Sequence, residues 1–231
     1  MSPLAVLENY LREGEISVSP LIDFKKGTDK LVLLDLTATN KSLSESIFSN
    51  TGTFCDWINL QIGEEAGCYG IGGYTEHRVI YSRSEHFGTD EERRIVHLGT
   101  DIWAPEGTVI FSPLDASVHS FNFNDNLCDY GGTIILRHQH KTLEFYSLYG
   151  HLSVASLDGL WEGKRIKSGE KLGDLGNILE NGNWPPHLHF QLIFDLEGMK
   201  GDYPGVCKVS EKAKYLANCP DPEIILRYTF E

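Results

Sequence analysis

The sequence predicts a mainly β protein, an antiparallel β-sandwich or barrel that carries an N-terminal extension and short peripheral helices. Two observations support this fold class. From about residue 60 onward, glycine becomes frequent and the apolar runs become short. Turn-forming stretches, such as residues 129–132 and 181–183, separate these runs. Short apolar runs divided by glycine-rich turns are typical of antiparallel strands.

The predicted elements follow from local patterns along the chain. Residues 2–14 are expected to form a short amphipathic helix, because their leucines recur at helical spacing, Ser2 suits the cap and Gly14 the stop. Residues 30–37 (KLVLLDLT) predict a buried strand, and residues 38–53, rich in Ser, Thr and Asn, predict a surface loop. The other expected strands are residues 78–81, 108–112, 116–123, 133–137, 143–148 and 187–194, and a short helix is expected at residues 211–216.

Three segments are expected on this basis. Residues 1–60 form an N-terminal extension, residues 61–200 form the β domain, and residues 201–231 form a C-terminal tail with a short helix. The sequence leaves open whether residues 1–60 pack on the main domain, as part of its sheet or as a lid over the groove, or form a separate lobe. A chain of 231 residues has room for one large domain with such an extension. The sequence contains no low-complexity tract and no repeat at a fixed period.

The composition of the chain argues against nucleic-acid binding and against membrane insertion. Twenty basic and 33 acidic residues give a net charge of −13, which repels phosphate backbones and argues against nucleic-acid binding. No apolar run approaches the roughly 20 residues that span a bilayer, and the N-terminus lacks a signal-peptide core. The five cysteines form no Cys-x-x-Cys pair. We therefore expect a reduced, cytoplasmic protein without membrane contact; the residues leave open an export route without an N-terminal signal, and they do not predict an oligomeric state.

Two His-x-His pairs are present, and on a strand such a pair places both rings on one face. His138 and His140 lie between basic residues where a hairpin tip is expected, so a solvated turn is the interpretation favoured there. His187 and His189 lie in an otherwise apolar strand. A buried imidazole needs a partner, so this pair is either a set of ligands or a pair of hydrogen-bonded core histidines.

Two His-x-x-x-Asp pairs are also present. His86 and Asp90 run into an exposed charged stretch and are interpreted as surface-loop residues. His97 and Asp101 lie between apolar runs, which is the rigid support that a metal site requires. This second pair is therefore the preferred candidate for metal ligands.

Two histidines and one carboxylate make a three-ligand zinc site with one open position, the arrangement of catalytic zinc. The sequence has no His-Glu-x-x-His motif, so a histidine must move the proton. One histidine of the pair at 187 and 189 is left over for this task, and His151 is a second candidate, although a loop histidine is the simpler interpretation of His151. The residues alone leave these roles open.

With these motifs in view, the chain resembles the lysostaphin-type (LytM-like) zinc metallopeptidases. The resemblance rests on residues 97–101 (HLGTD), 149–152 (YGHL) and 186–190 (PHLHF) in that order, supported by residues 104–109 and 166–173. It covers roughly residues 78–195. It implies a small antiparallel β fold with a duplicated hybrid motif, and a zinc endopeptidase that acts on peptides of bacterial cell-wall cross-links.

Carried over residue by residue, the resemblance implies that His97, Asp101 and His189 bind Zn²⁺. It implies that His151 and His187 line the open side of the metal as catalytic residues, one moving the proton and the other stabilising the oxyanion. The expected partner is a small peptide or a peptidoglycan-like peptide.

The chain departs from the usual family pattern and is similar to a narrower version of it. Residues 181–186 replace a common Ser-Thr-Gly turn, and Gln191 stands where Glu is common. Residues 69–72, 202–206 and the variant PHLHFQ resemble the intracellular version found fused to class III aminotransferases. This narrower likeness agrees with a cytoplasmic protein and makes a cell-wall substrate less expected.

Two other functions remain as alternatives. The first is a non-catalytic metal-binding or ligand-binding module on the same scaffold. The second is a phosphocarrier-like domain with facing histidines, which is disfavoured because Asp101 would repel a phosphohistidine.

Overall fold

The computed structural model describes residues 1–63, 65–89 and 92–227. Its centre is one open, eight-stranded sheet with the strand order β1-β2-β4-β11-β8-β7-β6-β9. Two small sheets, β10 with β5 and β12 with β3, flank it. The strands are β1 (Lys30–Leu34), β2 (Cys68–Gly72), β3 (Val96–His97), β4 (Thr100–Trp103), β5 (Val109–Phe111), β6 (Ala116–Asn124), β7 (Gly131–His140), β8 (Leu143–Leu152), β9 (Arg165–Ile166), β10 (Lys171–Asp174), β11 (His187–Ile193) and β12 (Val206–Cys207).

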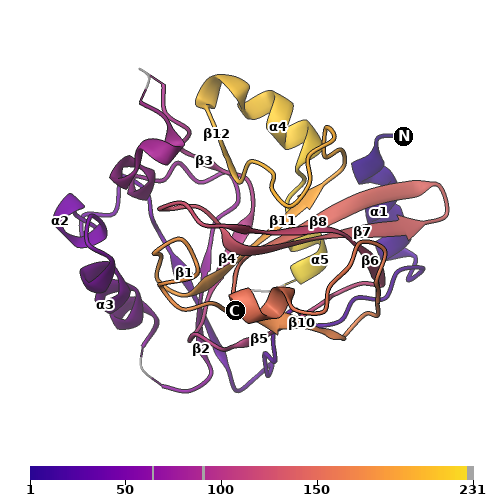
Figure 1. Ribbon diagram of the computed structural model, residues 1–231, viewed down its shortest axis with the longest axis horizontal. Coiled ribbons are helices and arrows are strands. Elements are labelled where there is room, and N and C mark those ends of the chain that lie inside the picture. The colour runs from indigo at the N-terminus through magenta and orange to yellow at the C-terminus, as the bar shows by residue number, and fades with distance from the viewer. Residues whose placement is uncertain (64, 90–91, 228–231) are drawn as a thin grey trace.

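Short helices surround the sheet (Figure 1). Ser2 caps the first of them, its hydroxyl accepting a hydrogen bond from the backbone N–H of Ala5, as expected from the sequence. The α-helices are α1 (Pro3–Arg12), α2 (Glu45–Phe48), α3 (Thr51–Ile62), α4 (Lys212–Asn218) and α5 (Glu223–Leu226), and the 3₁₀ turns are η1 (Ile80–Arg83), η2 (Glu85–Phe87), η3 (Val154–Leu157) and η4 (Val209–Glu211).

The predicted mainly β fold is confirmed, with two corrections to its architecture. The sheet is mixed rather than purely antiparallel, because β1 pairs parallel to β2 while each other pair of neighbours is antiparallel. A parallel pair needs a crossover, and α2 and α3 provide it between β1 and β2. The sheet is open at β1 and β9 and forms no closed barrel.

Two local predictions were wrong. Residues 38–53, expected as a loop, contain α2 and the start of α3. The polar residues that suggested a loop serve in part as helix caps, since the Asn50 side chain accepts a hydrogen bond from the Thr53 N–H. Residues 78–81, expected as a strand, form one isolated bridge from Arg78 to Thr37 and then enter η1.

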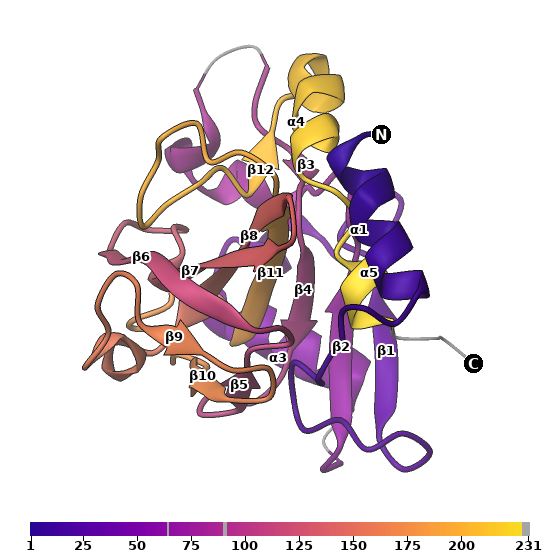
Figure 2. The same cartoon turned by 90° about the vertical axis from the view of Figure 1, so that its right-hand side faces the viewer.

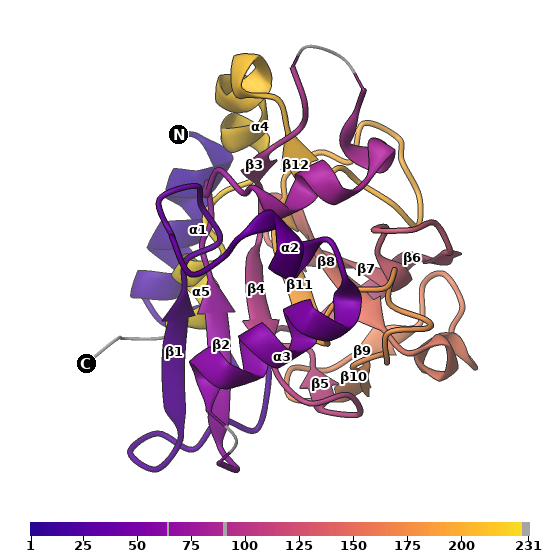
Figure 3. The same ribbon diagram turned by 90° about the vertical axis from the view of Figure 1, so that its left-hand side faces the viewer.

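Helices cover the sheet on opposite faces (Figures 2 and 3). On one face, α1 and α5 bury Leu7, Leu11 and Ile225 in the largest apolar cluster, which also contains Leu188 and Phe190 of β11. On the other face, α3 buries Phe54, Trp57 and Ile58 in a cluster with Trp103 and Trp184. Side chains of a strand alternate between faces, so the histidines of β11 point toward the α3 side.

Candidate metal centre

Neighbouring strands bring the sequence-predicted histidines and Asp101 together. The strand β11 lies between β4 and β8, and its His189 stands opposite Asp101 on β4 and opposite Gly150 on β8. His97 ends β3, three residues before β4 begins. His187 stands opposite Trp103, two residues before His189 and therefore on the same face.

Two glycines make room for this arrangement. A Cβ atom on Gly99 would lie 2.7 Å from Cε1 of His189 and 2.7 Å from the Phe190 carbonyl oxygen. A Cβ atom on Gly150 would lie 2.5 Å from Cδ1 of Tyr130, whose ring packs beside His189 with centroids 5.1 Å apart. The Gly in His-Leu-Gly-Thr-Asp and the Gly in Tyr-Gly-His-Leu are therefore steric requirements of the site.

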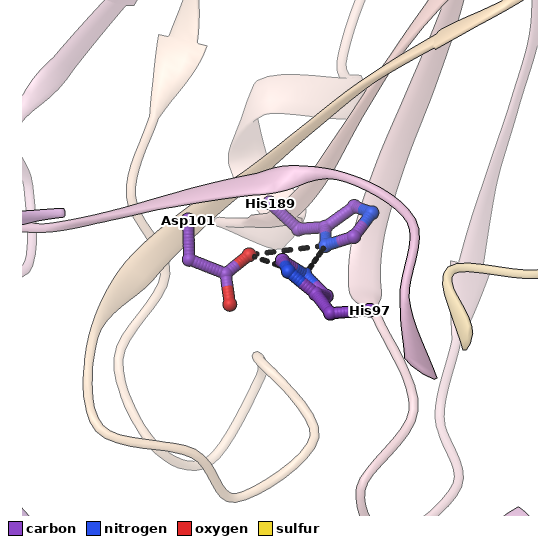
Figure 4. A group of neighbouring side chains, drawn as sticks. All are labelled: His97, Asp101 and His189. Carbon is purple, nitrogen blue, oxygen red and sulfur yellow. Dashed lines mark hydrogen bonds and ion pairs between the residues drawn. The ribbon is translucent and has the colours of Figure 1, made fainter. Parts of the chain in front are cut away.

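Three side-chain atoms converge at the centre of the site (Figure 4). Nε2 of His97 and Nδ1 of His189 are 3.0 Å apart, and Oδ1 of Asp101 lies 3.2 Å from the first and 3.0 Å from the second. Each imidazole donates its other N–H away from this point: Nδ1 of His97 to the Gly73 carbonyl at 3.1 Å, and Nε2 of His189 to Oε1 of Gln191 at 2.9 Å. Each converging atom therefore presents a lone pair.

This donor set fits a divalent cation. Lone pairs that face one another in a buried place repel unless a positive charge lies between them. Two imidazole nitrogens and one carboxylate oxygen are ligands that suit zinc, and tetrahedral bonds of about 2.0–2.1 Å would separate ligand atoms by roughly 3.3 Å. The hydrogen bonds to Gly73 and Gln191 orient the rings in the way that metal-binding histidines usually require. His97, Asp101 and His189 are the residues that would hold the ion.

The second oxygen of Asp101 faces a buried arginine. Nη1 of Arg78 donates a short hydrogen bond to Oδ2 of Asp101. Burial works to raise the pKa of Asp101, but nearby positive charge, Arg78 in particular, outweighs burial and holds that pKa well below its usual value. Burial, together with Arg78, lowers the pKa of His97 to about 3, so this imidazole is neutral and able to act as a ligand.

His151 and His187 are held in a matching way beside the cluster. Nδ1 of His151 donates to the Asn181 carbonyl at 2.9 Å, and Nδ1 of His187 donates to the Pro185 carbonyl at 2.7 Å. Their ring centroids are 4.1 Å apart, and Nε2 of His187 lies 3.8 Å from Oδ2 of Asp101. Burial lowers the pKa of both imidazoles, so both are neutral at pH 7 and keep an Nε2 lone pair.

A cavity of about 120 Å³ opens beside these side chains. His151 and His187 line it, together with Asp101 and His189 of the cluster. Its walls are largely aromatic and come from α3, η1, η2 and β4 as well as from the turn before β11. The aromatic residues concerned are Phe54, Tyr81, Phe87, Trp103, Tyr130, Trp184 and Tyr203.

The structure brings in three residues that sequence reasoning did not assign to the site. Gln191 shares a face with His187 and His189, so the period of two along the strand was a usable signal for it. Tyr130, which the sequence predicts only as part of a turn, lies with its hydroxyl 3.5 Å from Nε2 of His189. Arg78 is predicted only as part of a strand, and no local pattern indicates its contact with Asp101.

The other histidine candidates lie outside the cluster. The solvated-turn interpretation of His138 was wrong: the residue is 2% exposed on β7, between the Asp115 carbonyl at 3.0 Å and the Ser147 hydroxyl at 2.6 Å. His140 is half-buried near Glu15. His86 is exposed, as expected, although it also lines the cavity, and its predicted partner Asp90 lies outside the described residues.

The region that holds the cluster is similar to a known family. Residues 95–200 match the model of peptidase family M23, and this segment is called the M23-matched segment below. The match includes the three converging residues and both His151 and His187. No curated protein matches the chain.

Several solved structures are similar to the chain over part of its length. A zinc-containing peptidase from Vibrio cholerae is 26% identical over 43% of this chain and 28% of its own, with a TM-score of 0.34. Csd3 from Helicobacter pylori is 25% identical over 54% of this chain and 31% of its own, with a TM-score of 0.34. The catalytic domain of lysostaphin from Staphylococcus simulans is 18% identical over 52% and 80%, with a TM-score of 0.35. This chain thus spans less than a third of the length of the first two.

The helices give no sign of a membrane span. Within the part of the chain that the structure describes, none is both long enough and apolar enough to cross a bilayer.

Proposed function

We propose that this protein is a zinc-dependent peptidase that hydrolyses an amide bond in a short peptide. The observation that carries the proposal is the convergence of three lone-pair atoms from His97, Asp101 and His189 within 3.2 Å, beside two buried histidines that each keep a free Nε2. The match of residues 95–200 to peptidase family M23 supports hydrolytic chemistry at this place.

We assign the proton transfer to histidine side chains of this protein. His97, Asp101 and His189 would hold a zinc ion, which would supply Lewis-acid activation of water and of the substrate carbonyl. The neutral imidazoles of His151 and His187 offer Nε2 as a general base, and the ring that takes the proton returns it to the leaving amine. Because the two rings lie 4.1 Å apart, their positive charges repel, and the pair favours carrying one proton at a time. The protonated ring also donates to the oxyanion that develops on the substrate carbonyl.

We propose a short peptide as the substrate because the cavity is small. It measures about 120 Å³, and aromatic side chains from outside the M23-matched segment, among them Phe54 and Phe87, form part of its wall. The sequence likeness to the aminotransferase-fused intracellular version points the same way, toward an amino-acid-containing substrate in the cytoplasm. A peptidoglycan-like peptide is the alternative within the same chemistry.

Metal analysis of purified variants tests the metal site. We expect one zinc ion per wild-type chain and a strong loss of zinc in His189→Ala, with zinc retained in the surface variant His140→Ala. Equal zinc content in wild type and His189→Ala would contradict the ligand assignment.

Turnover of a panel of short D- and L-peptides tests the catalytic roles. His151→Ala and His187→Ala should each keep zinc while kcat/KM falls about 10²–10⁴-fold, the usual worth of a general acid or base. A zinc-loaded wild-type protein that cleaves none of the peptides would instead favour the non-catalytic binding module.

A further inference from the structure

A buried arginine from outside the M23-matched segment contacts Asp101, the carboxylate of the candidate metal site. Arg78 precedes the matched residues 95–200, and only 2% of it is exposed. It reaches the site because its segment is anchored on both sides: Arg78 forms a bridge with Thr37, and His77 forms one with Val96.

The two oxygens of Asp101 have separate partners. Oδ1 faces the ring nitrogens of His97 and His189, at 3.2 and 3.0 Å. Oδ2 accepts the hydrogen bond from Nη1 of Arg78. The carboxylate therefore presents one oxygen to the cluster, and the other is occupied by a charge-assisted hydrogen bond.

Three further contacts fix the guanidinium in this position. Nε of Arg78 donates to Oε2 of Glu76 at 2.7 Å, and Oε1 of Glu76 in turn accepts the Leu36 N–H at 2.9 Å. Nη1 also lies 3.3 Å from the Tyr81 hydroxyl, and Cζ lies 5.7 Å from the centre of the Trp103 ring. Glu76 offsets part of the guanidinium charge, and the hydrogen bond from Nη1 fixes which oxygen of Asp101 faces the cluster.

We propose that Arg78 is a positioning residue that keeps Asp101 a one-oxygen metal ligand. The inference rests on the proposed zinc site. Without Arg78, Oδ2 has lost its donor in a buried place, and the carboxylate gains most by turning both oxygens toward the ion. The ion would then lose the open position on which catalysis depends.

Metal affinity and coordination number test this role separately from activity. In Arg78→Met, we expect zinc affinity, measured by competition with a chromophoric chelator, to fall about 10–100-fold, the usual cost of removing a partner of a metal ligand. We also expect the visible spectrum of the Co²⁺-substituted variant to weaken, as it does when coordination rises above four. Arg78→Lys keeps the charge but not the fork of donors, and should fall between wild type and Arg78→Met.

Arg83→Met is the matched control, because Arg83 also packs on a tryptophan, Trp184 at 4.9 Å, and donates to Thr51 rather than to a metal ligand. It should keep the wild-type affinity and spectrum. Unchanged or tighter zinc binding with an unchanged Co²⁺ spectrum in Arg78→Lys and in folded Arg78→Met would overturn the positioning role. A wild-type protein that takes up neither ion would overturn the metal site itself, and that result is distinct from equal binding by wild type and variants.

Discussion

The free nitrogen of each histidine decides what the site can do. In His97, His151 and His187, Nδ1 donates to a backbone carbonyl, and in His189 the side chain of Gln191 takes the equivalent role for Nε2. A neutral imidazole that donates its N–H from one ring nitrogen keeps a lone pair on the other ring nitrogen. The fold thereby selects four tautomers at once, two toward the metal cluster and two toward the cavity.

Gly99 gives a prediction at the same scale. Gly99→Ala should lower zinc affinity, because its methyl group would lie 2.7 Å from both His189 and the Phe190 carbonyl and must displace the ligand ring. Equilibrium dialysis against zinc measures the effect. Gly73→Ala is the matched control near the site, since its Cβ would meet only Glu76, at 3.6 Å, and its carbonyl still accepts from His97. Equal affinities in the two variants would contradict the steric argument.

At this scale, the sequence predicts the site residues that have a local spacing signal. It does not predict the residues whose contacts join distant positions of the chain. Spacing and apolar context selected His97 and Asp101 over the other His-x-x-x-Asp pair, and the structure places both beside His189. The contact of Arg78 with Asp101 spans 23 positions and that of Tyr130 with His189 spans 59. Neither has a local signature, because each arises from how separate strands and turns pack.

At the scale of elements, period-two alternation was the most informative signal. It predicted β11 with histidines on one face, and Leu188 and Phe190 do lie in the opposite core. The polar residues at the end of β7 favour a turn by composition, yet the strand runs to His140 and buries His138. A polar sequence at a hairpin end does not distinguish a solvated turn from a strand whose polar side chains find buried partners.

The β7–β8 hairpin gives a pH prediction through His138. Burial lowers the pKa of His138 from 6.5 to about 4. As pH falls from 6.5 toward 4, the unfolded chain takes up a proton that the folded chain refuses, so stability is lost on acidification. By pH 4 this histidine should cost about 3 kcal/mol of unfolding free energy relative to pH 7.

Urea unfolding of the metal-free protein between pH 7 and 4 measures that loss. In His138→Asn, the drop in unfolding free energy over this range should be smaller than in wild type by about the same amount. His140→Asn, two residues along the same strand, controls for the removal of an imidazole from this hairpin. Parallel pH profiles for wild type and His138→Asn would show that His138 does not contribute.

At the scale of the whole molecule, the M23-matched segment, residues 95–200, is built into a larger sheet (Figure 1). Its strand β4 pairs with β2, which pairs with β1, so residues on both sides of the predicted boundary at 60/61 share one sheet. That boundary also falls inside α3, which packs Phe54 into the cavity wall. The division into residues 1–60, 61–200 and 201–231 remains a prediction about folding units.

A fragment of residues 95–200 tests whether the metal site depends on the larger sheet. It contains His97, Asp101, His151, His187 and His189, but it lacks the Gly73 carbonyl that orients His97, the Arg78 guanidinium on Asp101 and the strand β2 beside β4. Loss of β2 and α3 would expose Trp103, which is 2% exposed in the whole chain and stacks on His187 with centroids 5.4 Å apart. We therefore expect the fragment to bind zinc at least 10-fold more weakly than the full chain and to unfold without a cooperative transition. Thermal unfolding and zinc titration of the two proteins check this, and a cooperative fragment with full affinity would show that the flanking segments shape only the substrate cavity.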